Sequence, residues 1–182
     1  MTEVVRLTLV AHAMTDAIAA ARFPGDEPLN DVGCRQAEAA AAQFRRGVSY
    51  FTGPERRARQ TAGLLGFDAT VDPLLADLNC GPWQGKRLED VPPGDLMVWL
   101  TDPTRAPHGG ESITELMQRV ARWLNSLTEN AAATVAVTHP AVIRAAILLA
   151  LDVPAKSFWR MDIAPLSRTA LHYRGGCWTL RW

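Results

Sequence analysis

Two short runs of apolar and β-branched residues, Val4–Val10 and Thr134–Thr138, are each followed within two positions by a histidine. This composition is typical of strands buried in a sheet. The second run leads directly into an apolar helical segment, Pro140–Leu151, whose proline fits the first turn of a helix. A strand that leads into a helix is the repeating unit of parallel sheets. These two segments therefore constrain the fold more than any other feature.

The segments between these runs repeat the alternation of strand and helix. Asn30 can cap a helix that we expect to run as far as Gly47. Ser49–Thr52 is a short β-prone run, and a helical pattern follows it from about Arg56 to Leu65. The alternation therefore occurs at least twice before the middle of the chain.

The C-terminal part adds a long helix and a hairpin. Apolar residues recur at helical spacing between Ile113 and Leu127, which predicts an amphipathic helix. Ser167–Tyr173 and Cys177–Trp182 flank Gly175-Gly176 and predict a closing hairpin. Taken together, the segments predict an α/β three-layer sandwich, with a mostly parallel central sheet and helices on both faces.

Between residues 72 and 110 the alternation stops, and six prolines separate short pieces of chain. Such a proline content can indicate a disordered linker, but Trp83, Trp99 and several leucines favour ordered packing. A chain of 182 residues is long enough for one sizeable core. We therefore expect a single domain over residues 1–182, with residues 72–110 as a short cap-like insertion over the active site.

Charge and cysteine content exclude several function classes. Nineteen basic residues balance nineteen acidic ones, so we expect neither nucleic acid nor membrane as a partner, and any anion site must be local. The N-terminus lacks a basic leader and a spanning apolar stretch, which predicts a cytoplasmic location. Cys34, Cys80 and Cys177 lie far apart and outside C-x-x-C spacing, so neither a disulfide framework nor a zinc site is expected.

The two histidines are the first candidates for a functional site. In sheets of this kind, ligands bind beyond the carboxyl ends of the strands. His12 and His139 both fall there, so they could face one another across an anion site. Either histidine alone is more often a hydrogen-bonded structural residue. The strand pattern by itself leaves both interpretations open.

Five segments, in order along almost the whole chain, match the motifs of one family. They are Ala11-His12-Ala13, Gly53–Ala62 (GPERRARQTA), Asp77–Gly85, Gly109–Ser112 and Val137–Arg144. Their pattern resembles the histidine phosphatase superfamily, which includes phosphoglycerate mutases, and the second segment is the most specific match. The resemblance is nearer to small α-ribazole phosphatase-like and broad-specificity phosphatases than to mutases. Mutases of the family generally have a longer insertion, whereas residues 74–109 hold only Lys86, Arg87 and Arg105 as basic side chains.

The resemblance implies a role for each matched residue. His12 would attack a phosphomonoester to form a phosphohistidine, which water then hydrolyses without a metal or other cofactor. Arg57 would bind the phosphoryl group, and His139 would donate hydrogen bonds to it as negative charge builds. Asp77 stands where the family usually carries the glutamate that protonates the leaving alkoxide. Glu111 is a rival acid near the substrate, and we rank Asp77 first on geometry.

The first motif departs from the family, because Ala11-His12-Ala13 replaces arginine-histidine-glycine. A hydrogen bond to a charged group contributes about 1.5 to 3 kcal/mol, so losing that arginine predicts activity reduced roughly ten- to a hundredfold. Pro140 also replaces a residue whose backbone N–H is available to the phosphate. Arg22 matches a family loop arginine near the substrate and could fill the vacancy; an ordered water or a bound anion are the alternatives.

Three hypotheses about function, and a less expected fourth, follow from the sequence. The first is a metal-independent phosphomonoester hydrolase that acts on a small phosphorylated metabolite with reduced activity. The second is a degenerate family member that binds a phosphorylated ligand without turnover, for which Ala11 is the main support. A phosphoglycerate mutase is less expected than either. The third is an oligomerisation role, since six tryptophans could supply contact surface, and a homodimer is compatible with every hypothesis.

Overall fold

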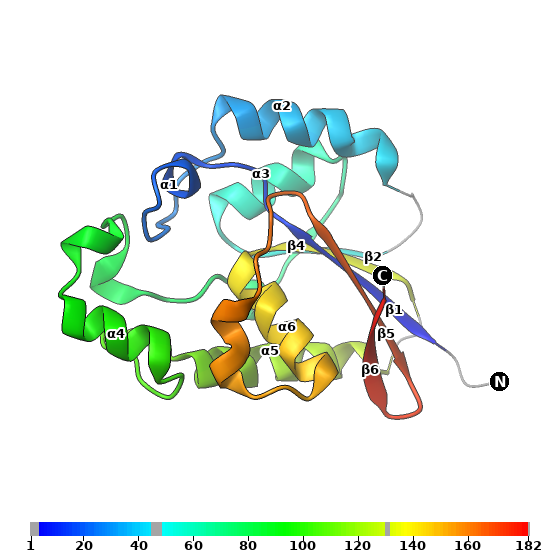
Figure 1. Ribbon diagram of the computed structural model, residues 1–182. Coiled ribbons are helices and arrows are strands. Elements are labelled where there is room, and N and C mark those ends of the chain that lie inside the picture. The colour runs from blue at the N-terminus through cyan, green and yellow to red at the C-terminus, as the bar shows by residue number, and fades with distance from the viewer. Residues whose placement is uncertain (1–3, 45–48, 130–131, 182) are drawn as a thin grey trace.

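The protein is described by a computed structural model that covers residues 4–44, 49–129 and 132–181. Six strands of this part of the chain form one sheet in the order β3-β2-β4-β1-β5-β6 (Figure 1). The strands are β1 (Val5–Ala11), β2 (Ser49–Thr52), β3 (Thr70–Val71), β4 (Thr134–Thr138), β5 (Arg168–Arg174) and β6 (Cys177–Arg181). Strands β1 to β4 pair in parallel, whereas β5 and β6 add an antiparallel edge. The predicted α/β fold with a mostly parallel sheet is confirmed.

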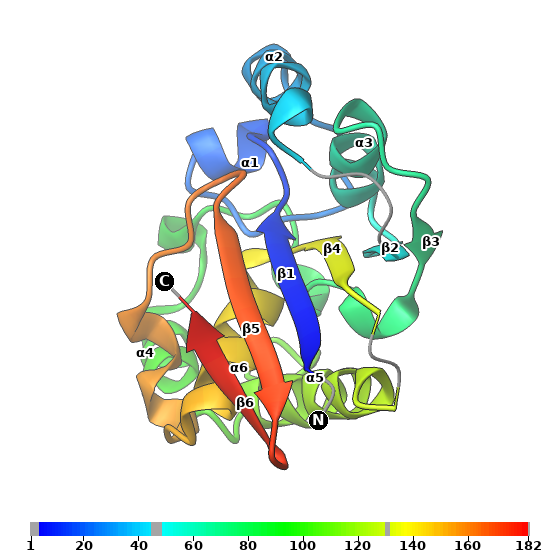
Figure 2. The ribbon, with the colours of Figure 1, turned by 90° about the vertical axis from the view of Figure 1, so that its right-hand side faces the viewer.

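Helices cover both faces of this sheet (Figure 2). Helices α2 (Asp31–Ala40) and α3 (Arg56–Leu64) lie on one face, and α5 (Ile113–Leu127) and α6 (Pro140–Leu151) lie on the other. Two further helices, α1 (Asp16–Ala19) and α4 (Pro93–Thr101), lie beyond the carboxyl end of β1. Among the described residues, no helix is long and apolar enough to cross a membrane.

The side chains of β1 show why both faces need cover. Leu7 and Leu9 are buried in the core cluster formed with α5 and α6, whereas Val10 is buried in the cluster formed with α3. Successive side chains of a strand point to opposite faces. An apolar strand such as β1 therefore has to be covered by helices on both sides.

Most predicted elements are confirmed to within a residue. The bounds of β2, β4, α5 and α6 are those predicted, and Asn30 caps α2 by accepting a hydrogen bond from the Gly33 N–H at 2.9 Å. The predicted end of α2 at Gly47, a residue outside those described, is wrong. The α-helix ends at Ala40, and Phe44 adopts an extended backbone beyond a short 3₁₀ turn. There the Phe44 ring packs edge-on against Phe67, with 5.1 Å between centroids, so tertiary packing ends the helix early.

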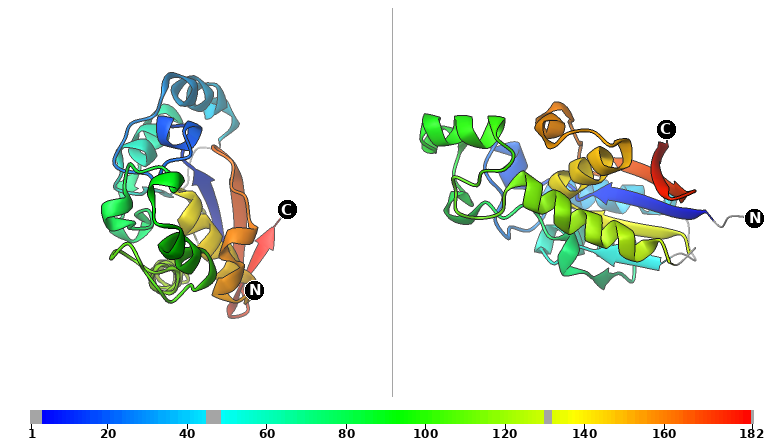
Figure 3. Two further views of the ribbon diagram at one scale, coloured as in Figure 1. Left: turned by 60° about the vertical axis from the view of Figure 1, so that its left-hand side comes forward. Right: turned by 90° about the horizontal axis from the view of Figure 1, so that it is seen from below.

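Residues 72–110 are ordered, as expected from their tryptophans. They form three 3₁₀ turns, Pro73–Leu75, Gly81–Trp83 and Leu88–Asp90, and the helix α4, which the sequence pattern did not predict. Trp83 and Trp99 are buried, and their ring centroids both lie within 5.3 Å of Phe23. The segment extends beyond the carboxyl ends of the parallel strands (Figure 3). It therefore stands where a ligand site of this fold class is expected.

Candidate active site

The two histidines meet at one edge of the sheet. His12 directly follows β1, and His139 follows β4 and caps α6. Because β1 and β4 are parallel neighbours, their carboxyl ends lie together, and the His12 N–H donates to the Thr138 carbonyl at 2.9 Å. The centroids of the two imidazole rings are 5.2 Å apart. Sheet topology thus brings together two residues from opposite ends of the chain.

His12 is held in one tautomer. Its Nδ1 lies 2.8 Å from the Ala13 carbonyl oxygen; since a carbonyl only accepts, Nδ1 carries the hydrogen and Nε2 keeps its lone pair in the neutral ring. The side chain is 3% exposed. Burial, reinforced by the charges of His139 and Arg57, lowers the pKa of His12 from 6.5 to about 3. The ring is therefore neutral and nucleophilic near neutral pH.

Arg57 is buried at the start of α3. Its Nη2 donates to Asp77 Oδ2 at 2.6 Å, and its Nη1 donates to the Gly25 carbonyl. Glu27 lies 3.8 Å away as a further carboxylate. With only 1% of its surface exposed, the guanidinium depends on these acceptors to balance its desolvation.

Asp77 links the arginine to the second histidine. Besides its bond to Arg57, Oδ2 lies 3.4 Å from His139 Nδ1, and Oδ1 accepts from the Leu78 N–H at 2.8 Å. Burial alone would raise the pKa of Asp77, but the charges of His139, Arg57 and His12 outweigh it and hold that pKa below its ordinary value. The insertion thus places an ionised carboxylate among the three residues that the family resemblance selected.

Glu55 is a site residue that sequence reasoning missed. Its Oε2 lies 2.7 Å from His139 Nε2, and its Oε1 accepts from the Asp77 N–H at 2.9 Å. Gly53 makes room for this pair, because a Cβ there would lie 2.9 Å from His139 Nε2 and 2.8 Å from the Leu75 carbonyl oxygen. The signal was present in the second motif, where Gly53, a residue without a side chain, stands two residues before the ionisable Glu55.

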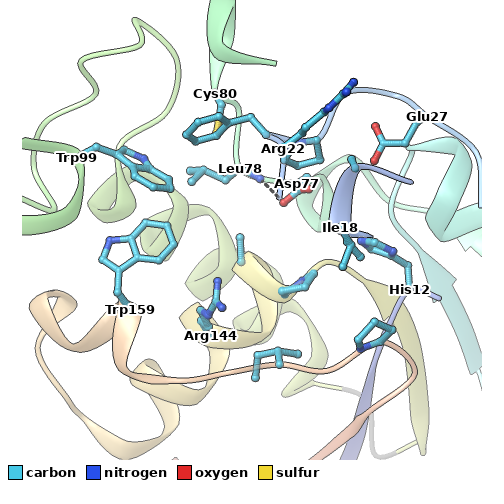
Figure 4. Close-up of a pocket in the computed structure, with 17 residues that line it drawn as sticks. His12, Ile18, Arg22, Glu27, Asp77, Leu78, Cys80, Trp99, Arg144 and Trp159 are labelled. Atoms are coloured by element: carbon cyan, nitrogen blue, oxygen red, sulfur yellow. Dashed lines mark hydrogen bonds between the residues drawn. The ribbon is translucent and has the colours of Figure 1, made fainter. Parts of the chain in front are cut away.

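A cavity of about 260 Å³ opens beside His12 (Figure 4). His12, Asp77, Arg22 and Pro140 line it, whereas Arg57 and His139 contact Asp77 without lining the cavity. The Arg22 side chain is directed away from His12 and makes no hydrogen bond or ion pair within the described part of the chain. Pro140 occupies the first position of α6. Two of the three residues expected near the substrate, Arg22 and Pro140, therefore line the cavity.

The third, Glu111, lies elsewhere. Arg119 donates to both of its carboxylate oxygens, at 2.8 and 2.7 Å, and also to the Leu74 and Ala76 carbonyls at 2.8 Å. Glu111 does not line the cavity beside His12. Its contacts hold Arg119 against the chain just before Asp77, the residue that it was expected to rival as the acid.

Ala11 does not border the cavity either. It is fully buried in the core cluster that contains Leu7 and Leu9. Its backbone N–H donates to the Ser167 carbonyl at 3.1 Å, and its carbonyl accepts from the Leu166 N–H at 3.0 Å. The surroundings of position 11, where the family has its arginine, are thus filled by packed chain.

Within the described ranges, no group of three His, Cys, Asp or Glu side chains is placed to hold a metal ion.

Comparison with known proteins agrees with this geometry. The "Bifunctional protein Rv2228c" of Mycobacterium tuberculosis is 32% identical over 97% of this chain, which spans about half (52%) of that relative's length. The "Probable phosphoglycerate mutase GpmB" of Yersinia pestis is 30% identical, over 93% of this chain and 86% of the relative.

Two solved structures share the fold. The structure titled "Mycobacterial hydrolase 1" matches with a TM-score of 0.88 and 28% identity, over 98% of this chain and 97% of that one. Mycobacterial glucosyl-3-phosphoglycerate phosphatase Rv2419c matches with a TM-score of 0.85 and 28% identity, over 97% of both chains. The family model of the histidine phosphatase superfamily (branch 1) matches residues 7–182. With the site and the fold in agreement, this chain belongs to the histidine phosphatase superfamily.

Proposed function

We propose that the protein is a metal-independent phosphomonoester hydrolase that forms a phosphohistidine at His12 and acts on a small phosphorylated metabolite. One observation carries the proposal. His12 lines the cavity as a neutral ring with Nδ1 tied to Ala13, and the Arg57, Asp77 and His139 cluster adjoins it. A neutral imidazole with a fixed tautomer is a competent nucleophile for phosphoryl transfer. We place this activity in the cytoplasm, without nucleic acid or membrane as partner.

Each step has a residue to perform it. His12 Nε2 attacks phosphorus, the bond from phosphorus to the ester oxygen breaks, and the departing alkoxide takes a proton from Asp77. Water then attacks the phosphohistidine and returns a proton to Asp77, and the bond from phosphorus to Nε2 breaks to release phosphate. Arg57 and His139 would stabilise the phosphoryl oxygens in both steps.

Asp77 must gain a proton before it can act as an acid. Its carboxylate is bound to Arg57 and lies beside His139, the two groups that would hold the phosphoryl oxygens. A phosphoryl group that enters would compete for these partners and add negative charge, and both effects raise the pKa of a carboxyl group. Substrate binding itself therefore prepares the acid.

We infer that turnover is reduced relative to family members with an arginine in the first motif. Ala11 supplies no donor, and Arg57 is already bound to a carboxylate. The same two observations favour the second candidate function, in which the protein binds a phosphorylated ligand without turnover.

The decisive experiment measures phosphate release from a panel of small phosphomonoesters by chelator-treated protein. We expect slow release by the parent, a covalent phosphoryl adduct in its intact mass, and loss of both in His12→Ala. His172→Ala is the matched control, because His172 lies on β5, outside the cavity, and should change neither. Phosphate binding without release from any ester would establish the binding-only function instead.

A further inference from the structure

The cavity beside His12 has an aromatic wall that the hydrolytic steps do not use. Its rings are Phe23 from the loop after α1, Trp99 from α4, and Trp159 from the 3₁₀ segment Ala155–Arg160. The centroids of Phe23 and Trp99 are 5.3 Å apart, and those of Trp99 and Trp159 are 4.2 Å apart. The rings come from three separate segments and pack against one another. They therefore form a preorganised surface for a flat apolar group.

The size of the cavity limits that group. Its volume of about 260 Å³ lies just below the range of small-molecule pockets, roughly 300 to 1,000 Å³. Aliphatic side chains of Ile18, Leu78 and Ile163 complete the apolar lining. A single ring together with a phosphoryl group is the scale of ligand that such a space accepts.

Arg144 stands at the other end of the cavity from His12 (Figure 4). It extends from α6 beside Trp159, with its guanidinium carbon 5.6 Å from the Trp159 ring centroid and 5.7 Å from that of Phe158. Its Nε donates to the Met161 carbonyl at 2.8 Å. Within the described part of the chain, its two Nη groups make no hydrogen bond or ion pair.

A guanidinium in this setting favours an anion. Burial lowers the pKa of Arg144, against the charges of Asp162 and Asp77, yet an arginine side chain stays ionised in proteins. Its free N–H donors have lost part of their hydration without gaining partners. Two parallel N–H donors match the geometry of a carboxylate. The far end of the cavity thus presents N–H donors that suit a carboxylate, separated from His12 by apolar surface.

We propose that the substrate is a small aryl or similarly flat phosphomonoester that carries a carboxylate opposite its phosphate. The carboxylate binds Arg144, the flat body lies against Trp99 and Trp159, and the phosphorus faces His12. This inference rests on the proposed function, because it assigns the substrate class of the same site.

Binding of phosphonates tests this carboxylate subsite at Arg144 without requiring turnover, since the bond from carbon to phosphorus is not hydrolysed. We would compare para-(phosphonomethyl)benzoate with its neutral amide by tryptophan fluorescence and calorimetry. We expect the parent to bind the carboxylate at least about tenfold more tightly than the amide, as a charge-assisted hydrogen bond provides. In Arg144→Gln the preference should fall to less than about twofold.

Arg160→Gln is the matched control, because it removes the same charge from an exposed residue of the adjoining 3₁₀ segment, and it should keep the full preference. If Arg144→Gln fails to fold, Arg144→Lys, which keeps the charge but loses the paired donors, should show a reduced preference. The comparison of the two ligands in the parent depends on no variant. Equal binding of carboxylate and amide by the parent, or binding of neither, overturns the subsite.

A hydrolysis arm separates this inference from the proposed function. The substrates are para-carboxyphenyl phosphate and its carbamoyl counterpart. Release of phosphate from both at equal kcat/KM overturns the subsite and leaves the hydrolase standing. A clear carboxylate preference in phosphonate binding without any phosphate release supports the subsite and overturns the hydrolase.

Discussion

The two histidines at the sheet edge are held in hydrogen bonds, whereas the residues that the insertion adds to the cavity are mainly apolar. His12 and His139 are each fixed by a defined acceptor at the ends of β1 and β4. Trp99 and Leu78, from residues 72–110, contribute apolar area. Asp77 is the exception, because it belongs to the insertion but is bound by Arg57 of α3. From this difference we expect the sheet edge to govern the proposed chemistry and the insertion to govern which ligand fits.

The strongest test of this division is Ala11→Arg, which restores the family residue on the sheet side. Ala11 is fully buried in the core, so the larger charged side chain should overpack it and lower the free energy of unfolding by about 3 kcal/mol or more. We expect no gain in phosphatase activity. Urea unfolding and phosphate release measure the two effects.

Ala19→Arg, at an exposed position of α1, is the control and should leave stability nearly unchanged. An Ala11→Arg variant that is as stable as this control and more active would show that an arginine at position 11 reaches the cavity. The alanine at position 11 would then account by itself for the reduced activity that we infer.

The next largest effect concerns pH and the buried ring of His12. Its pKa is about 3 in the folded protein against 6.5 ordinarily, so between these values the unfolded chain binds a proton that the folded chain does not. The free energy of unfolding is therefore highest above pH 6.5 and falls as the pH drops toward 3, because the proton then favours the unfolded chain. Between about pH 6.5 and 4.5 the loss should reach about 2 kcal/mol.

His12→Asn removes this titration, so the variant should lose about 2 kcal/mol less than the parent over the same interval. Urea unfolding at several pH values measures the difference. If both proteins lose stability in parallel, the ring is not held neutral by burial, and the contrast between the two sides of the cavity weakens.

A smaller effect is expected at Glu55, which positions His139. Glu55→Gln keeps an acceptor but removes the charge beside Nε2, and we expect kcat to fall about tenfold, or about 1.4 kcal/mol. KM should change little, because Glu55 does not line the cavity. Steady-state kinetics across the pH range measure both parameters.

Glu89→Gln, at an exposed residue of the insertion, should alter neither parameter. A Glu55→Gln variant with a raised KM and an unchanged kcat would assign Glu55 to substrate binding rather than to positioning.

The smallest effect belongs to the insertion side. Trp99→Phe retains an aromatic ring but reduces its area, so KM for phenyl phosphate should rise about two- to fivefold, which corresponds to less than about 1 kcal/mol. We expect kcat to stay within about twofold. A large fall in kcat with unchanged KM would show that the insertion takes part in chemistry beyond Asp77.

Elements with regular periodicity were predictable from the sequence, and contacts that depend on tertiary packing were not. The strand β4 and the helices α5 and α6 follow directly from apolar spacing and from Pro140. The early end of α2 was not predictable, because it depends on where Phe67 lies. Helix α4 was not predicted because prolines precede and follow it, although a proline such as Pro93 is compatible with the first turn of a helix.

The candidate site divides in the same way. The motifs selected His12, Arg57, Asp77 and His139, and the structure brings all four together. Glu55 and Arg144 stood inside the same motifs, but their roles depend on which neighbour each side chain meets. No spacing rule could show that Glu55 meets His139 or that Arg144 borders Trp159.

Gly53 has a consequence for how this site could evolve. A side chain there would press on His139 and on the Leu75 carbonyl, and it would also lie 3.2 Å from Glu55. Any larger residue at position 53 would therefore require His139 or the turn Pro73–Leu75 to shift. We therefore expect the effect of a substitution at position 53 to depend on the residues at positions 55 and 139, which is epistasis between these positions.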